Sequence, residues 1–151
     1  MGIKVNSKHI GIVSEYKVIS KLLEIGYNVS LPIGDNCSYD LLIDYHGIIL
    51  RCQVKTMRGT KYSSIIMPLR RCRINTKGYT SKPYDKGEID LFLGYYKKNN
   101  SVYFYPFKNS NLTNSVTFKL GKPKNSQVAK INFAYTYKVE NLRKYLKTRH
   151  Q

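Results

Sequence analysis

Apolar residues recur at helical spacing near the start of the chain. Four of them stand at intervals of four, three and four positions: Ile12, Tyr16, Ile19 and Leu23. This spacing is typical of a helix. Ser7 is suited to cap its first turn, and Gly26 is suited to end it. The pattern therefore predicts a helix over residues 8–25.

Shorter apolar runs bounded by turn residues predict strands further along the chain. These runs are 27–32, 39–45, 48–55, 89–96, 101–105 and 115–120. His46-Gly47 joins the second and third runs into a hairpin, and a turn at 97–100 makes 101–105 the partner of 89–96. Residues 56–82 have room for another hairpin, with 62–68 and 70–75 as its arms. A helical pattern returns at 137–148, so the order of elements predicts one mixed α+β domain spanning 1–151.

Charge narrows the classes of partner. The chain has 26 Lys and Arg residues against 9 Asp and Glu residues, a formal net charge of +17. Its 42% hydrophobic content, with 14 tyrosines, is enough to form a core and excludes disorder for most of the chain. A folded domain with this charge favours a polyanion as partner. Nucleic acid is favoured over a membrane surface, because the bases are spread between tyrosines and serines and do not form a basic amphipathic helix.

The positive charge is concentrated in two stretches. Residues 91–151 carry twelve bases against Glu140 alone, and residues 51–82 carry nine bases and no acid. A random scatter would rarely leave 32 residues without an acid. We therefore interpret these stretches as binding surface and not merely as solvated lysine and arginine.

Cysteine usage and the absence of targeting segments indicate a cytoplasmic protein. The three cysteines, Cys37, Cys52 and Cys72, are widely spaced and include no C-x-x-C pair. This favours a reducing compartment over a disulfide framework or a zinc ribbon. No run approaches 18 apolar residues, so no membrane span is expected, and the N-terminus lacks the apolar region of a signal peptide.

Strand alternation brings together side chains suited to phosphodiester chemistry. Side chains of 50–55 point alternately to the two faces, so Gln53 and Lys55 share the face opposite the core. The hairpin brings Asp40 towards the same end. A carboxylate and an amide oxygen can hold Mg²⁺, and a nearby lysine can orient or deprotonate a nucleophile. Glu15 is a polar residue among apolar neighbours on the helix. Each residue alone is an ordinary surface residue, but together, directly before a basic tract, they favour a catalytic site.

This constellation resembles a known family. Asp40, twelve residues, then Gln53-x-Lys55, after a helix bearing Glu15, is similar to the motif of the PD-(D/E)xK nuclease superfamily. The phrases at 32–42 and 51–56, Pro-Ile-Gly-Asp-Asn-Cys-Ser-Tyr-Asp-Leu-Leu and Arg-Cys-Gln-Val-Lys-Thr, resemble a branch in which glutamine replaces the second acid. That branch includes homing endonucleases encoded in group I introns of cyanobacteria.

The resemblance implies a fold, a reaction and a set of roles. The fold is a restriction-endonuclease-like α/β core, in which helices flank a central mixed β-sheet. The reaction is cleavage of double-stranded DNA with Mg²⁺ or Mn²⁺, carried out by a homo-oligomer that is at least a dimer and in the larger alternative a tetramer. Asp40 matches the first metal-binding acid, and Gln53 stands in place of the second. Lys55 matches the lysine, and Glu15 matches the helix carboxylate. Gln53 can bind metal through its carbonyl oxygen but brings no charge.

The basic tract near 56–82 is the candidate insertion that reads DNA. A two-stranded ribbon fits the major groove, where arginine reads guanine, while other bases bind phosphates. The expected DNA-binding residues are Arg58, Lys61, Arg70, Arg71, Arg73, Lys77 and Lys82. The alternatives are a four-way-junction resolvase, which reads shape, and a non-catalytic DNA- or RNA-binding domain. A non-catalytic binding domain would not account for the spacing of the four site residues. A structural RNA-binding protein would more often have a disordered basic tail, whereas 137–151 has a helical pattern.

Overall fold

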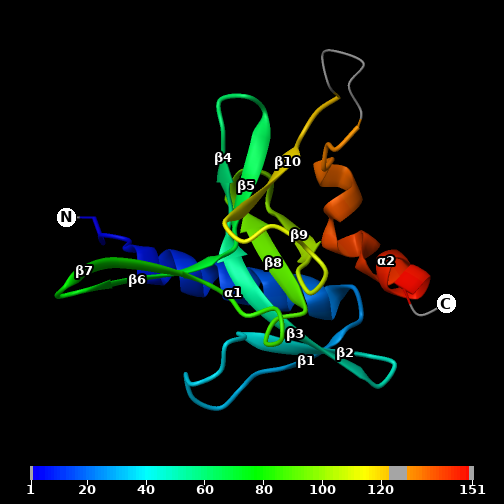
Figure 1. Cartoon of the computed structure of the whole chain (residues 1–151), viewed down its shortest axis with the longest axis horizontal. Coiled ribbons are helices and arrows are strands. Elements are labelled where there is room, and N and C mark those ends of the chain that lie inside the picture. Colours follow the sequence, from blue (N-terminus) through cyan, green and yellow to red (C-terminus); the bar gives the residue numbers. More distant parts are fainter. Residues whose placement is uncertain (1, 123–128, 150–151) are drawn as a thin grey trace.

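A five-stranded sheet forms the centre of the molecule, with strands in the order β1-β2-β3-β8-β9 (Figure 1). The computed structural model describes residues 2–122 and 129–149. The strands are β1 (Asn28–Ser30), β2 (Leu41–Tyr45), β3 (Ile48–Thr56), β8 (Leu91–Tyr96) and β9 (Ser101–Pro106). β3 and β8 run parallel and the other neighbours run antiparallel. This confirms the α+β class and the central mixed sheet of a restriction-endonuclease-like core.

Two tight turns set the register of the sheet, and the hairpins predicted over 39–55 and 89–105 are both present. His46 and Gly47 connect β2 to β3 with φ angles of 50° and 83°, in the left-handed region that suits a two-residue hairpin turn. Leu41 is thereby paired with Cys52. A short 3₁₀ helix (η1, Lys97–Asn99) connects β8 to β9.

Both faces of the central sheet are covered. All six residues of β8 are buried, as expected of a central strand between two layers. One face packs against helices α1 (Ser7–Glu24) and α2 (Leu142–Arg149), where Val18, Leu22 and Leu146 join the core. The helix expected at 137–148 begins with 3₁₀ turns η2 (Ala134–Tyr137) and η3 (Val139–Asn141) and becomes α-helical only at Leu142. In the described part of the chain, neither α1 nor any other helix has the length and apolar character needed to cross a membrane.

A smaller sheet covers the opposite face. Its strands are β10 (Ser115–Lys119), β5 (Ser64–Pro68) and β4 (Arg58–Gly59), in that order. Their apolar side chains pack with Phe92 and Tyr96 of β8 in a second core. Met57 and Met67 fill the space above Gly94, the one position of β8 without a side chain.

Helix α1 is present as predicted, but of the four apolar residues whose spacing indicated it, only Ile19 packs against the core. Tyr16 and Leu23 are 68% and 56% exposed, whereas Ser14, Val18 and Leu22 are buried. Because Ser14 is polar, the pattern of apolar residues in the sequence does not reveal that Ser14, Val18 and Leu22 form the inward face. The Ser14 hydroxyl is satisfied by the Ile10 carbonyl at 3.1 Å and by Thr56 Oγ1 at 2.6 Å.

The helix begins at Ser7, one residue earlier than predicted, and its cap is correspondingly one residue earlier. Asn6, and not Ser7, is the N-cap residue, and its Oδ1 accepts a hydrogen bond from the backbone N of His9 at 3.0 Å. Asn and Ser are comparable N-cap residues, and two suitable residues in succession leave the start ambiguous from sequence. Gly26 ends the helix as predicted, with φ of 87°.

The basic tract divides into two separate elements, and the hairpin predicted within it is wrong. β6 (Arg70–Asn75) pairs with β7 (Gly78–Pro83), while 64–68 belongs to the smaller sheet. Gly78, with φ of 112°, and the Asn75 side chain, which accepts from Lys77 N at 3.0 Å, make the turn between β6 and β7. We call the β6–β7 pair the ribbon. It projects from the body (Figure 1), and Ile74 and Tyr79 near its tip are 85% and 66% exposed.

Gly94→Ala should lower the free energy of unfolding by about 1–3 kcal/mol, because an added methyl group overpacks this core. It would lie 2.5 Å from Met57 Sδ and 2.6 Å from Met67 Cε. Urea denaturation of the purified variant measures the change. Gly11→Ala is the matched control. No atom lies within 4 Å of that added methyl in α1, so helix propensity should make it neutral or stabilising. Equal effects of the two substitutions would contradict the packing argument.

Candidate active site

Asp40 lies immediately before β2 and is hydrogen-bonded to the middle of β3. Its backbone N donates to the Cys52 carbonyl at 2.9 Å. Its Oδ2 accepts from Val54 N at 2.8 Å and from Gln53 Nε2 at 2.5 Å. Sequence alternation therefore placed Gln53 correctly on the face that Asp40 reaches.

Burial and hydrogen bonds act on the Asp40 carboxyl in opposite directions. Burial raises its pKa above the usual range, against the Val54 N–H and the positive charge of Lys55, which both lower it. A half-buried carboxylate of this kind gains from a nearby cation. Oδ1 takes no part in the hydrogen bonds formed by the described residues, so it is the oxygen that can face a ligand.

Asp40 lies between two hollows. Glu15 and Tyr16 of α1 line the first, a cavity of about 320 Å³, together with Asp40. Gln53, Arg71 and Tyr84 line the second, a cavity of about 340 Å³, again with Asp40. The pKa of Glu15 is raised, first by burial and then by the negative charge of Asp40. The carboxylates of Glu15 and Asp40 therefore lie close enough to interact electrostatically, as expected if both belong to one site.

Lys55 shares this end of the sheet but is held by the ribbon and not by Asp40. Its Nζ donates to the Arg70 carbonyl at 3.0 Å and to Tyr84 Oη at 2.9 Å. Among the described residues it forms no ion pair with Asp40. Burial lowers the pKa of Lys55 to about 8, although the charge of Asp40 opposes this.

The donor set suits a divalent cation only if Gln53 contributes. Within residues 2–122 and 129–149, no three His, Cys, Asp or Glu side chains are grouped so as to hold a metal. Two interacting carboxylates and one amide oxygen are nevertheless hard ligands of the kind that Mg²⁺ takes. Gln53 Nε2 is used by Asp40, which leaves Oε1 for a cation. Repulsion between Glu15 and Asp40 would be relieved by that cation, so the residues fit a divalent metal.

Arg51 shares the alternation of Gln53 and Lys55 but belongs to a separate pairing. Its backbone N and its Nε both donate to Asp90 Oδ2 at 2.9 Å. Burial raises the pKa of Asp90, but these hydrogen bonds outweigh it and leave that pKa below its ordinary value. This pair fixes the loop before β8 to β3 and keeps Arg51 out of the site.

The seven basic residues expected to bind DNA lie on two elements. Arg58 and Lys61 belong to β4 and the turn after it, and the other five, Arg70, Arg71, Arg73, Lys77 and Lys82, belong to the ribbon. Arg70 is used within the chain, because its guanidinium donates to Ser81 Oγ at 2.7 Å and to Asn114 Oδ1 at 3.0 Å. Arg71 and Arg73 both line the same hollow as Asp40, and the charge of Arg71 also acts on the Asp40 carboxyl and lowers its pKa.

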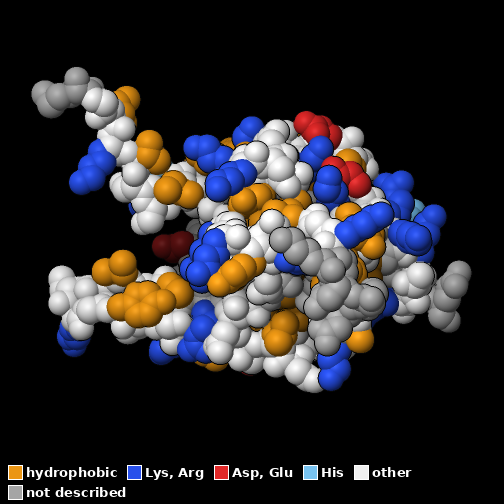
Figure 2. Space-filling view, turned by 90° about the horizontal axis from the view of Figure 1, so that it is seen from above, with side chains coloured by type: hydrophobic (Ala, Val, Ile, Leu, Met, Phe, Trp, Pro, Cys, Tyr) orange, Lys and Arg blue, Asp and Glu red, His pale blue; other side chains and the backbone are white. Residues whose placement is uncertain are grey.

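Positive charge gathers along the ribbon. Figure 2 shows the N-terminal segment and the ribbon projecting on the same side of the molecule, with Lys and Arg side chains along the ribbon. An acidic side chain is visible further back, in the space between these two arms.

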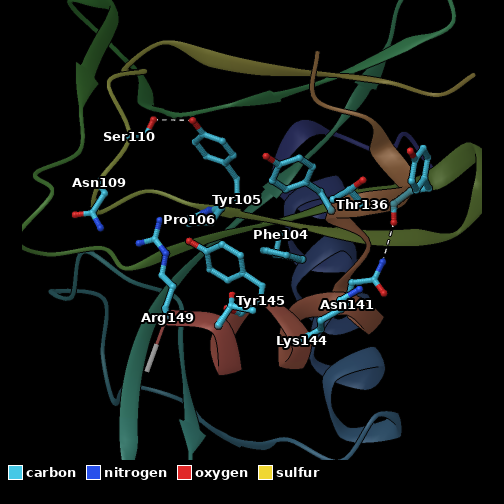
Figure 3. A pocket seen from close by; sticks show the side chains of 13 residues that line it. Phe104, Tyr105, Pro106, Asn109, Ser110, Thr136, Asn141, Lys144, Tyr145 and Arg149 are labelled. Carbon is cyan, nitrogen blue, oxygen red and sulfur yellow. Dashed lines mark hydrogen bonds between the residues drawn. The ribbon is translucent and has the colours of Figure 1, made fainter. Parts of the chain in front are cut away.

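Two larger cavities elsewhere lack the groups for hydrolysis. One, of about 620 Å³, lies between β9 and α2 and is lined by tyrosines such as Tyr105, whose hydroxyl is 2.6 Å from Ser110 Oγ (Figure 3). The other, of about 700 Å³, is lined by Lys61, Lys119, Lys122 and Lys130. Neither lining includes a carboxylate. The chemistry of the lining residues, and not cavity size, therefore identifies the candidate active site.

Tyr84 is the site residue that sequence reasoning missed. It follows directly after β7, contacts Lys55 and lines the hollow beside Asp40. Among 14 tyrosines nothing distinguishes it except its place immediately after Pro83, where the basic tract ends. Only the observed pairing of β6 with β7 brings it to Lys55.

Lys55 should make stability depend on pH between about 8 and 10.5, its folded and ordinary pKa values. In this range the unfolded chain holds the lysine proton and the folded chain has released it, so the free energy of unfolding rises with pH. The free energy of unfolding of wild type, measured relative to that of Lys55→Met, should therefore rise by about 2–3 kcal/mol from pH 7 to pH 10. Urea denaturation at several pH values measures it. A difference independent of pH would contradict the assigned burial of the ammonium.

Comparison with solved structures supports the fold. The chain is similar to a bacterial homing endonuclease, I-Ssp6803I, with a TM-score of 0.72 and 24% sequence identity over 97% of this chain and 98% of that one. At this identity the likeness shows the fold alone. Comparison with curated proteins finds no match.

Comparison with protein families is more specific. The sequence model described as PD-(D/E)XK endonuclease matches residues 5–140, which include all four candidate site residues, Glu15, Asp40, Gln53 and Lys55. The match covers most of the chain and confirms the resemblance drawn from those residues. The chain belongs to the PD-(D/E)XK endonuclease family.

Proposed function

We propose that this endonuclease cuts double-stranded DNA at specific sites, with Mg²⁺ or Mn²⁺ as cofactor, and that it serves in intron homing. One observation carries the proposal: Asp40 and Gln53 line one hollow with Arg71 and Arg73 of the projecting ribbon, and Asp40 also lines a second hollow with Glu15. The family accounts for the endonuclease reaction. The ribbon accounts for a duplex substrate, because a two-stranded ribbon fits the major groove.

In this proposal Asp40, Glu15 and Gln53 Oε1 hold the cation. A metal held by these residues would supply two effects: a lower pKa for a bound water molecule and an offset to the charge that develops on the phosphoryl oxygens. Gln53 contributes an oxygen without charge, so the two carboxylates supply all of the negative charge. Val54 N keeps Asp40 oriented through its 2.8 Å hydrogen bond.

Lys55 acts on the nucleophile and the phosphate. A lysine with a pKa of about 8 exchanges its proton near physiological pH, so it can orient or deprotonate an attacking water. Arg71 lines the hollow beside Asp40, and the positive charges of Lys55 and Arg71 both act on the Asp40 carboxyl. A scissile phosphate placed beside Asp40 would therefore have two cations nearby.

Site recognition falls mainly to the ribbon. Arg73 and Lys77 are exposed on it, and so are Ile74 and Tyr79, which can contact base edges and thymine methyl groups. Arg58 and Lys61 on the smaller sheet bind phosphates further along the duplex. One such site cuts one strand, so double-strand cleavage calls for a homo-oligomer, at least a dimer. The homing function rests on the likeness to I-Ssp6803I, a homing endonuclease by name.

The proposal is tested with purified protein and three DNAs in Mg²⁺ or in EDTA. The first joins the sequences that flank the genetic element carrying this gene, the second is a shuffled duplex and the third is a four-way junction. We expect discrete, metal-dependent cleavage of the first alone. Cleavage confined to the junction would support a resolvase, and binding without cleavage of any DNA would support a non-catalytic domain.

Asp40→Asn should reduce the cleavage rate by about a thousandfold, because removal of the central metal ligand forfeits several kcal/mol of transition-state stabilisation. DNA affinity should remain, since the asparagine keeps the shape. Single-turnover kinetics and a binding assay measure the two quantities.

Asp44→Asn is the matched control for Asp40→Asn. Asp44 lies on the same strand, but it is exposed and its Oδ1 accepts from Gly47 N in the hairpin turn. Its cleavage rate should equal that of wild type. A rapid Asp40→Asn enzyme, or an equally slow Asp44→Asn enzyme, would remove Asp40 from the metal site.

Gln53→Glu should retain cleavage and reach half its maximal rate at a lower Mg²⁺ concentration. The substitution adds a negative charge beside Asp40, which raises carboxyl pKa values but attracts the metal more strongly. At neutral pH attraction should prevail, because carboxyls ordinarily ionise well below pH 7. Cleavage rates over a Mg²⁺ titration measure this. Unchanged Mg²⁺ dependence in both Gln53→Glu and Gln53→Ala would show that residue 53 is not a ligand.

A further inference from the structure

The ribbon meets the candidate active site at its root. β6 begins at Arg70 and β7 ends at Pro83, and these two residues face each other in the register. Proline has no N–H, so Pro83 cannot donate a hydrogen bond to the Arg70 carbonyl. Lys55 Nζ donates to that carbonyl at 3.0 Å. The lysine thus closes the end of the ribbon where the strand pairing lacks a donor.

Tyr84 makes the second contact at this root. It is only 8% exposed, and its hydroxyl accepts from Lys55 Nζ at 2.9 Å. The ammonium also lies 4.7 Å from the centre of the Tyr84 ring. Phe92 packs edge-on against the same ring with centroids 5.4 Å apart, which fixes the ring against β8.

Tyr84 also contacts a second cation. The Arg71 guanidinium lies 5.0 Å from the centre of its ring. Arg71, Tyr84 and Asp40 line one hollow. A single buried tyrosine therefore contacts both cations nearest Asp40, one of them from the central sheet and the other from the ribbon. Cation–π contacts of this kind are strongest when partly shielded from water.

We propose that Tyr84 is a positioning residue for the nuclease reaction, holding Lys55 through its hydroxyl and Arg71 through its ring at the root of the ribbon. This inference rests on the proposed function. The first strand of the ribbon begins and the second ends at this contact. A change in how the ribbon binds DNA would therefore also move Lys55 and Arg71. A mismatched site that seats the ribbon poorly would then be cut slowly even when it is bound.

Two substitutions separate the hydroxyl from the ring. Tyr84→Phe keeps the ring and should lower the single-turnover cleavage rate by about tenfold, the effect of one hydrogen bond to a charged group. Tyr84→Leu removes the ring as well and should lower the rate further. DNA affinity, measured with Ca²⁺ in place of Mg²⁺, should be unchanged for Tyr84→Phe.

Tyr95→Phe is the matched control. Tyr95 is also buried, but its hydroxyl donates to Asn100 Oδ1 at 3.0 Å and does not contact Lys55. This variant should cut as fast as wild type once bound. A wild-type rate for Tyr84→Phe, or equal losses of rate and affinity in that variant, would overturn the proposal and leave Tyr84 a purely structural residue.

A second measurement does not depend on cleavage. Acetic anhydride in trace amounts acetylates lysines according to how free each amine is, and mass spectrometry of digests quantifies Lys55 against Lys82 in the same protein. Tyr84→Phe should raise Lys55 labelling several-fold and leave Lys82 unchanged. If wild type cuts no DNA, the proposed function fails, yet this labelling still decides whether Tyr84 holds Lys55. Unchanged Lys55 labelling would overturn the inference in either case.

Discussion

The register of the β2–β3 hairpin is the constraint on which the site depends. The left-handed turn at His46 and Gly47 fixes that register, and Asp40 secures its far end through Val54 N and the Cys52 carbonyl. A shift of one residue would turn every side chain of β3 to the opposite face. Gln53 and Lys55 would then enter the core, and Cys52 and Val54 would replace them beside the carboxylates.

The same hairpin explains how the protein tolerates charge at the edge of its core. Burial works against the charged forms of both Asp40 and Lys55, raising the pKa of one and lowering that of the other. Hydrogen bonds from Val54 N to Asp40, and from Lys55 to Arg70 and Tyr84, offset part of this cost. What is left uncompensated is the mutual repulsion of Glu15 and Asp40, which makes the site receptive to a cation.

How far the sequence predicted this arrangement depended on the range of each interaction. Period-two alternation and a two-residue turn placed Asp40 and Gln53 together, because both signals are local. The pairing of β6 with β7 was missed because β7 is polar and largely exposed, so it lacks the apolar alternation that reveals a strand, and 70–75 was paired with the run before it. Tyr84 was missed because its contact with Lys55 spans 29 positions. The inward face of α1 could not be predicted because it includes the polar residue Ser14, whose burial depends on a hydrogen bond with Thr56 of β3.

In the proposed function, recognition and catalysis share residues at the root of the ribbon. An isolated two-stranded hairpin is at best marginally stable in water, and the tip residues Ile74 and Tyr79 bury little surface. The order of the ribbon must therefore come from its root, where Arg70 is braced by Ser81 and Asn114 and its carbonyl accepts from Lys55. The buried lysine proposed to act on the nucleophile thus also anchors the arm proposed to read DNA. Any change that loosens this root alters both the ribbon and the cation beside Asp40.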